Sequence, residues 1–120
     1  IPGGSDSPVE SLNPLWGIYS AVTRQDHEGY PEGGWQPEER MTMEEAVKMF
    51  SAWAAYASFE EDLKGTIEVG KLADFTILSK DIFKEDPRVL LETKVLMTVI
   101  GGEIMYDILL KPDDLLLAEE

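Results

Sequence analysis

The chain has 120 residues, of which 43% are hydrophobic and none is cysteine, so it can hold one packed domain but neither a disulfide nor a thiolate metal site. A closed eight-stranded α/β barrel is excluded, because it takes about 250 residues. The formal net charge of −14 disfavours nucleic-acid and membrane partners. With no apolar run of roughly 20 residues, no recognisable signal peptide and no cysteine, we expect a cytoplasmic protein.

The first third of the chain predicts a loop, a helix and a second loop. Turn-forming residues fill positions 3–8, after which Asn13 and Pro14 supply an N-cap and a first helical residue. The helix should extend to about Thr23, because apolar residues recur at helical spacing up to that point. Residues 25–40 hold too many glycines and prolines for a helix, and a loop of this length either serves a function or covers the core.

The middle of the chain predicts the longest helix. Thr42 and Glu45 have the spacing of a capping box. The apolar stripe behind them predicts one helix from Met43 to about Phe59. After Gly65 the period of the pattern changes from that of a helix to that of short strands.

The last part of the chain predicts a small sheet. Asp86-Pro87 is a helix start, and Gly101-Gly102 is a two-residue hairpin turn. Strands are expected at 66–68, 73–79, 94–100 and 103–106. Helices followed by a few short strands indicate an α+β fold. A sheet this small usually needs further strands to pair with, which points to missing chain.

Five segments carry a family resemblance. They are Gly4-Ser5-Asp6-Ser7-Pro8-Val9, Ala21-Val22-Thr23-Arg24, the run from Pro37 to Ala46, the run from Gly65 to Phe75, and Thr98-Val99-Ile100-Gly101-Gly102. As an ordered set they resemble the metal-dependent amidohydrolases. The Gly-Ser-Asp start with the later Thr-Arg points to the branch of N-substituted formamide deformylases and proteins labelled exoenzyme regulators.

The resemblance implies that this chain is the C-terminal part of such an enzyme. Residues 1–62 would be the end of a (β/α)8 barrel, starting at the C-terminal end of its eighth strand. Residues 63–110 would be the C-terminal part of a small composite β-sandwich, and residues 111–120 an acidic tail. The partner that completes this fold would be the remainder of the barrel or another copy of the chain.

Asp6 is the catalytic and metal-binding residue that the resemblance implies. In such enzymes this carboxylate binds a divalent metal, zinc by expectation, and takes a proton from the bound water that attacks an amide-type carbonyl. From the residues alone, Asp6 would instead be a turn former. A zinc hydrolase site needs about three protein ligands, whereas the chain has a single histidine, His27. We therefore expect the isolated chain to hold no metal and to be inactive.

Arg24 and Trp35 are candidates for substrate binding. The family match implies that Arg24 faces the mouth of the active site, with a surface salt bridge as the alternative. Trp35 either lines a substrate pocket or packs on the core. His27 is expected to be solvated or to face substrate, and Asp74 to hydrogen-bond the turn around Gly70.

Two functions from different classes follow from these observations. The first is a C-terminal fragment of a hydrolase that acts on carbon–nitrogen bonds, other than peptide bonds, of small amide-like substrates. The alternative is a free-standing acidic binding or regulatory module without catalysis. A module should keep its hydrophobic face closed, whereas a fragment should expose apolar surface.

Overall fold

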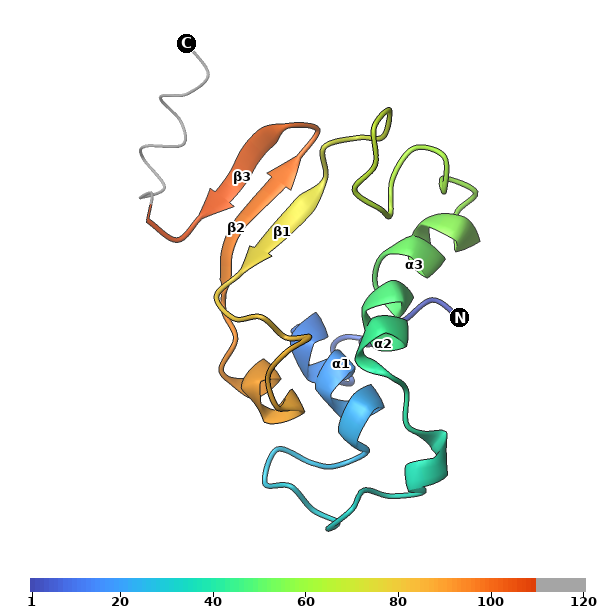
Figure 1. Cartoon of the computed structure of the whole chain (residues 1–120), viewed down its shortest axis with the longest axis vertical. Coiled ribbons are helices and arrows are strands. Elements are labelled where there is room, and N and C mark those ends of the chain that lie inside the picture. Colours follow the sequence, from blue (N-terminus) through green and yellow to red (C-terminus); the bar gives the residue numbers. More distant parts are fainter. Residues whose placement is uncertain (110–120) are drawn as a thin grey trace.

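A computed structural model describes residues 1–109 of the chain. The first part forms α1 (Pro14–Thr23), a 3-10 turn η1 (Pro37–Glu39), α2 (Met43–Met49) and α3 (Ala52–Ala57). The second part forms β1 (Phe75–Leu78), a 3-10 turn η2 (Pro87–Leu91), β2 (Val95–Ile100) and β3 (Glu103–Asp107) (Figure 1). Helices first and strands last agree with the α+β expectation, while the acidic tail expected at 111–120 lies outside the described residues.

Helix α1 begins and ends where the sequence predicts. The side chain of Asn13 accepts a hydrogen bond from the Leu15 amide at 3.1 Å, and Pro14 occupies the first helical position. Arg24 ends the helix in a left-handed conformation (φ 59°), and its amide donates to the Ser20 carbonyl at 2.8 Å. This αL ending satisfies a carbonyl of the last turn and redirects the chain into the next loop.

The single helix expected from Met43 to about Phe59 is wrong, because α2 and α3 are separated by a break at Phe50 and Ser51. The capping box at its start is confirmed, with reciprocal bonds between Thr42 and Glu45. The Ser51 hydroxyl donates to the Val47 carbonyl at 2.8 Å, a local bond of the kind that bends helices. The backbone of Ser51 is far from helical (φ −134°, ψ −96°).

The sheet is antiparallel, in the order β1-β2-β3. Gly101 and Gly102 both have positive φ (59° and 83°), which confirms the two-residue hairpin turn between β2 and β3. The strand expected at 66–68 is not formed. Its side chains Thr66 and Glu68 bind Lys71 instead, and no other strand among residues 1–109 offers this segment a ladder.

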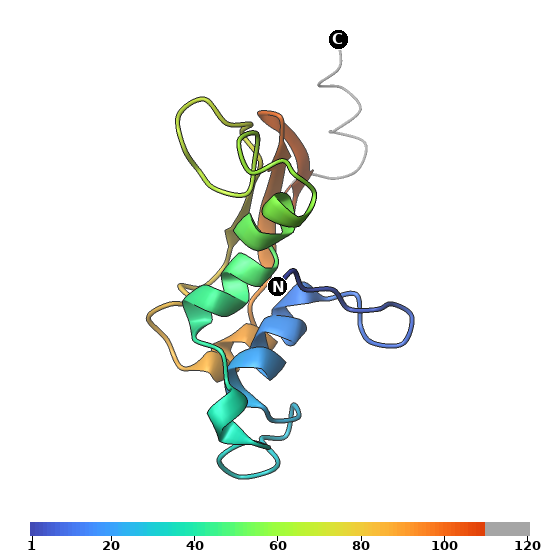
Figure 2. The ribbon, with the colours of Figure 1, turned by 90° about the vertical axis from the view of Figure 1, so that its right-hand side faces the viewer.

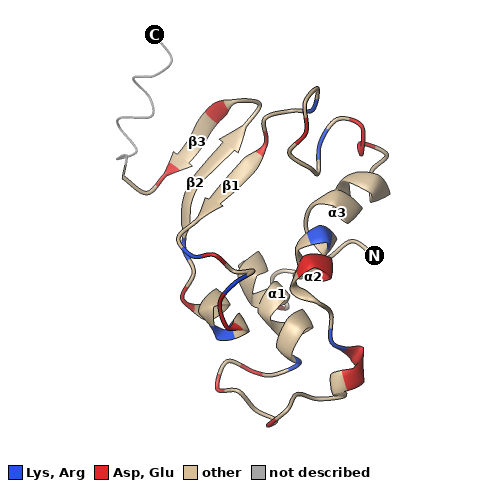
Figure 3. Cartoon of the chain, viewed as in Figure 1, with Lys and Arg blue, Asp and Glu red and all other residues tan. Residues whose placement is uncertain are grey.

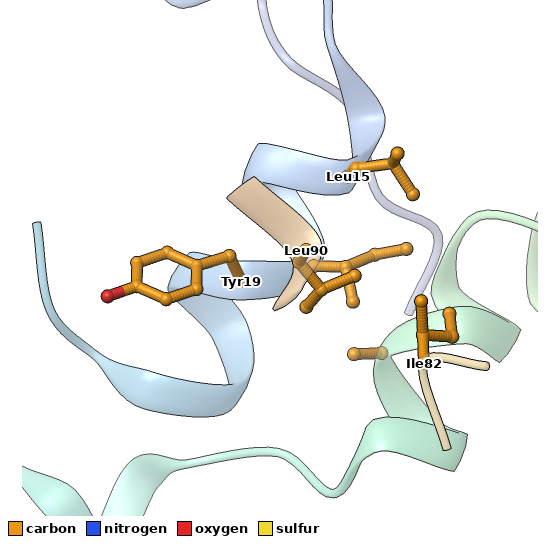
Figure 4. Close-up of a cluster of buried hydrophobic side chains, with 6 residues drawn as sticks. Leu15, Tyr19, Ile82 and Leu90 are labelled. Carbon is orange, nitrogen blue, oxygen red and sulfur yellow. The ribbon is translucent and has the colours of Figure 1, made fainter. Parts of the chain in front are cut away.

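The buried core lies on the helical side of the molecule. η2 packs against α1, and α2 packs against both α1 and α3. Figure 4 shows Leu15 and Tyr19 of α1 near Leu90 of η2 and Ile82. Ala46 of α2 is also fully buried in this cluster. Among residues 1–109, no helix is long and apolar enough to cross a membrane.

Candidate functional site

The loop before α1 carries Asp6. The Gly3 amide donates to the Met49 carbonyl at 2.8 Å, which ties the loop to the end of α2. Asp6 has a positive φ of 52°, and its carbonyl accepts from the Val9 amide at 2.9 Å. The loop extends away from the rest of the molecule (Figure 2), and the Asp6 side chain is exposed. The turn is thus closed by the backbone, and no hydrogen bond within the described residues uses the Asp6 carboxylate.

Arg24 and Trp35 form one unit at the other end of α1. The Trp35 amide donates to the Arg24 carbonyl at 2.9 Å, and Arg24 Nε donates back to the Trp35 carbonyl at 3.1 Å. The guanidinium lies over the indole, 4.9 Å from its centroid, within the range of a cation–π interaction. Trp35 is 60% exposed, so it does not pack on the core, and Arg24 is not in any of the ion pairs found among residues 1–109.

Gly34 allows the close approach that joins these two residues. Its φ is +87°, and a Cβ built there would lie 2.4 Å from the Thr23 carbonyl oxygen. Only a residue without a side chain fits at this distance. The glycine therefore lets the far end of the loop return to the end of α1.

Asp26 organises the loop between these two ends. Its Oδ1 accepts hydrogen bonds from the amides of Glu28 and Tyr30, each at 2.9 Å. The bond from the Tyr30 amide is the main reason why the pKa of Asp26 lies below its ordinary value of 3.8. Gln25 adds two bonds from its amide group, to the carbonyls of Gly29 (2.8 Å) and Pro31 (2.9 Å).

His27 lies at the surface against two aromatic rings of α1. Its ring is edge-on to Trp16, with 4.7 Å between centroids, and to Tyr19 at 6.0 Å. Its carbonyl accepts from Arg88 Nη2 at 3.2 Å. The side chain is exposed, which agrees with a solvated histidine, whereas a contact with substrate stays a prediction.

The structure does not gather the predicted site residues into one cluster. Asp6 precedes the start of α1, whereas Arg24 and Trp35 meet at its end, and ten helical residues rise about 15 Å. Among residues 1–109, no three His, Asp or Glu side chains come together in a way that could hold a metal ion. Within this described part, Asp6 offers one carboxylate to a kind of site that needs about three ligands, so the described residues do not fit a hydrolase metal by themselves.

Lys71 and Asp74, which belong to the matched run from Gly65 to Phe75, hold neighbouring segments by hydrogen bonds. Lys71 donates to the Glu61 carbonyl at 2.6 Å and to the Thr66 hydroxyl at 2.7 Å, and so holds the loop before β1. Asp74 Oδ1 accepts from the Gly101 amide at 2.7 Å. The expected partner of Asp74, the turn around Gly70, is wrong, because the carboxylate reaches across to the β2–β3 hairpin turn instead.

A groove of about 810 Å³ separates the helices from the sheet. Val47 of α2 and Ala54 of α3 line it from the helices, and Phe75 and Val99 line it from the sheet. In Figure 3 the strands are almost free of charged residues except near their ends. Strands that are apolar on both faces are typical of sheets covered on both sides, whereas here much of the sheet is exposed, including Ile77, Ile100, Ile104, Met105 and Tyr106.

Arg88, which contacts the loop around His27, is a residue that the sequence analysis did not single out. It lies 61 positions from His27 in the chain, and no local pattern predicts a contact over that separation. The Asp26 turn had a signal, because an Asp followed by Gly29 and Pro31 is typical of a side chain that hydrogen-bonds nearby amides.

The sequence matches the model of one protein family, described as the amidohydrolase family, over residues 1–106. The chain therefore belongs to the amidohydrolase family. Relatives include the protein named "Putative amidohydrolase YtcJ" of Bacillus subtilis strain 168, which is 38% identical over 88% of this chain and 20% of its own length. The N-substituted formamide deformylase of Arthrobacter pascens is 32% identical over 86% of this chain and 18% of its own.

A plant relative belongs to the same set. Protein LONG AFTER FAR-RED 3 of Arabidopsis thaliana is 38% identical over 86% of this chain and 17% of its own length. The chain thus spans at most a fifth of the curated relatives it matches. No solved structure matches it. The similarity to a formamide deformylase agrees with the branch that the Gly-Ser-Asp and Thr-Arg segments predict.

Proposed function

We propose that this chain is the C-terminal part of a longer hydrolase that cleaves carbon–nitrogen bonds, other than peptide bonds, in small amide-like substrates. The observation that carries the proposal is the Asp6 carboxylate, which lies exposed on a protruding loop and is not needed to close its own turn. This aspartate stands in a Gly-Ser-Asp segment of a chain that belongs to the amidohydrolase family. In the complete cytoplasmic protein, Asp6 supplies one ligand to a divalent metal, zinc by expectation, and residues elsewhere supply the others.

The open groove supports the proposal that further chain completes the fold. An apolar groove of about 810 Å³ and a sheet exposed on both faces would leave a small domain poorly stabilised in water. The remainder of the barrel and the missing sandwich strands, from the same protein or from another copy, would cover these surfaces. Residues 1–62 then end the barrel and residues 63–110 belong to the sandwich.

Arg24 and Trp35 contribute the substrate contact in this proposal. The guanidinium is held by its Nε bond and by the indole, which leaves its terminal nitrogens for a polar group of the substrate. The exposed indole face offers apolar contact beside it. A regulatory module without catalysis is disfavoured, because it would close its hydrophobic surface rather than expose it.

The test is hydrolysis by the protein at its natural length. An N-alkylformamide such as N-ethylformamide serves as the probe, because one relative is named an N-substituted formamide deformylase, and release of formate is measured. Asp6→Asn should reduce kcat by at least roughly a thousandfold, since a lost ligand disables the metal site. Glu10→Gln, which alters another exposed acid of the same loop, should leave kcat unchanged. Equal activity of Asp6→Asn and the unmodified protein would refute the role of Asp6.

A further inference from the structure

Arg88 connects the C-terminal half of the chain to the loop formed by residues 25–31, named here the His27 loop. Its Nη2 donates to the His27 carbonyl at 3.2 Å, and its Nη1 lies 3.5 Å from the Tyr19 hydroxyl. None of the ion pairs formed among residues 1–109 includes Arg88, although the chain carries a net charge of −14. Its guanidinium is engaged with neutral oxygens of the loop and of α1.

The segment that carries Arg88 is itself fixed. Asp86 caps η2, and its Oδ1 accepts from the Arg88 amide at 2.9 Å. Two positions further, Leu90 is fully buried against α1. The guanidinium thus extends toward the His27 loop from a backbone that is held by a cap on one side and by the core on the other.

The His27 loop offers carbonyl oxygens to Tyr19 and Arg88 and leaves space for the Arg88 guanidinium. The hydroxyl of Tyr19, which is fully buried, donates to the Asp26 carbonyl at 3.0 Å. The carbonyls of two successive loop residues, 26 and 27, are therefore held by Tyr19 and Arg88. Gly29 provides the space, because a Cβ built there would lie 3.0 Å from Arg88 Nη1. The Asp26 carboxylate meanwhile holds the amides on the other side of the turn.

We propose that Arg88 is a positioning residue, which fixes the His27 loop between Arg24 and Trp35, the two residues of the proposed substrate contact. The proposal rests on the proposed function, because that function assigns substrate contact to Arg24 and Trp35, which meet at the two ends of the segment that holds the His27 loop. Arg88 touches no reacting atom. It acts through the backbone of the His27 loop, which presents the His27 side chain and leads on to Trp35.

The first test measures amide hydrogen exchange of the protein without substrate. Arg88→Gln should raise exchange at Glu28, Gly29 and Tyr30 by roughly tenfold or more, because these amides are protected by the turn that the guanidinium holds. Exchange in β2 should not change. Arg40→Gln is the matched control, because among residues 1–109 the Arg40 guanidinium donates within its own turn, to the Pro37 carbonyl, and not to the His27 loop. Unchanged exchange at all three loop amides in Arg88→Gln would overturn the proposal.

The second test separates positioning from general stability through steady-state kinetics with N-ethylformamide. Arg88→Gln should raise KM by about three- to tenfold with kcat nearly unchanged, and Arg88→Lys should restore part of the loss. Faster exchange without a change in KM would overturn the positioning role, since the loop would then not serve binding. Absence of formate release by the unmodified protein would refute the proposed function itself and the positioning role with it, and so is distinguishable from failure of Arg88 alone.

Discussion

Arg24 shows how one backbone angle prepares a site residue. A left-handed conformation costs a non-glycine residue roughly 1–2 kcal/mol, and Arg24 adopts it with a φ of 59°. In this conformation the Arg24 carbonyl accepts from the Trp35 amide, and Arg24 Nε donates to the Trp35 carbonyl. The guanidinium lies over the indole ring. These contacts offset the strain, since a cation–π interaction at an exposed site stabilises by about 0.5–1 kcal/mol and each hydrogen bond adds a similar amount.

Asp26 gives the His27 loop a dependence on pH. The folded-state pKa of the Asp26 carboxyl is lowered, chiefly by the hydrogen bond from the Tyr30 amide. The stabilisation that the carboxylate gives to the folded loop is therefore fully present above the ordinary pKa of 3.8 and is lost as pH falls through the lower folded pKa. We predict that loop amide protection, measured by hydrogen exchange, decreases below pH 3.8. Asp26→Asn, which keeps an oxygen acceptor but does not titrate, should lose this dependence.

The matched control for this prediction is Glu28→Gln, which neutralises the neighbouring acid without removing the acceptor. It should keep the pH dependence of the unmodified loop, because only the backbone amide of Glu28 takes part in the turn. If Asp26→Asn and the unmodified protein lost loop protection in parallel with falling pH, the assignment to Asp26 would be wrong.

At the scale of the element, Gly34 tests whether the loop must close on α1. Gly33 and Gly34 both have positive φ (78° and 87°), but only at Gly34 would a Cβ meet the Thr23 carbonyl, at 2.4 Å. Gly33→Ala therefore incurs backbone strain alone, of about 1 kcal/mol. Gly34→Ala should cost roughly 1–3 kcal/mol more in free energy of unfolding. Equal losses in a denaturant titration of the two variants would contradict the close approach.

Elements fixed by neighbours in sequence could be predicted, and those fixed by distant contacts could not. The Asn13 cap, the capping box at Thr42 and the Gly101-Gly102 turn all depend on residues a few positions apart, and all three are confirmed. The break at Ser51, in contrast, involves a hydrogen bond from the Ser51 hydroxyl to the Val47 carbonyl, which the apolar pattern does not predict. The strand expected at 66–68 depends on a partner that the described residues do not provide.

In the candidate site, too, single residues could be predicted from the sequence, but contacts between distant segments could not. Asp6, Arg24 and Trp35 could be singled out from the resemblance to amidohydrolases, and family membership is confirmed. Their roles stay predictions. The pairing of Arg24 with Trp35 across Gly34, and the reach of Arg88 to His27, arise from how separate segments pack, and no short pattern encodes them.

At the scale of the whole molecule, the sheet has the apolar composition of a buried element, although many of its apolar side chains are exposed. Phe75 lines the groove, whereas Val69 is fully exposed outside it. We predict that the 120-residue chain alone binds an apolar fluorescent dye and self-associates, because the groove presents a large apolar surface. Phe75→Glu should reduce dye fluorescence more than Val69→Glu. Equal dye fluorescence in both variants would show that the groove is not the exposed surface.

The intact mass and metal content of the protein isolated at its natural length test the central claim most directly. The account predicts a species of about 50–60 kDa, as a barrel with a sandwich requires and as the Bacillus subtilis relative, of which this chain covers 20%, implies, with about one or two divalent ions bound. A metal-free species with the 13.4 kDa of this chain would contradict it, and Asp6 would then be a turn residue only.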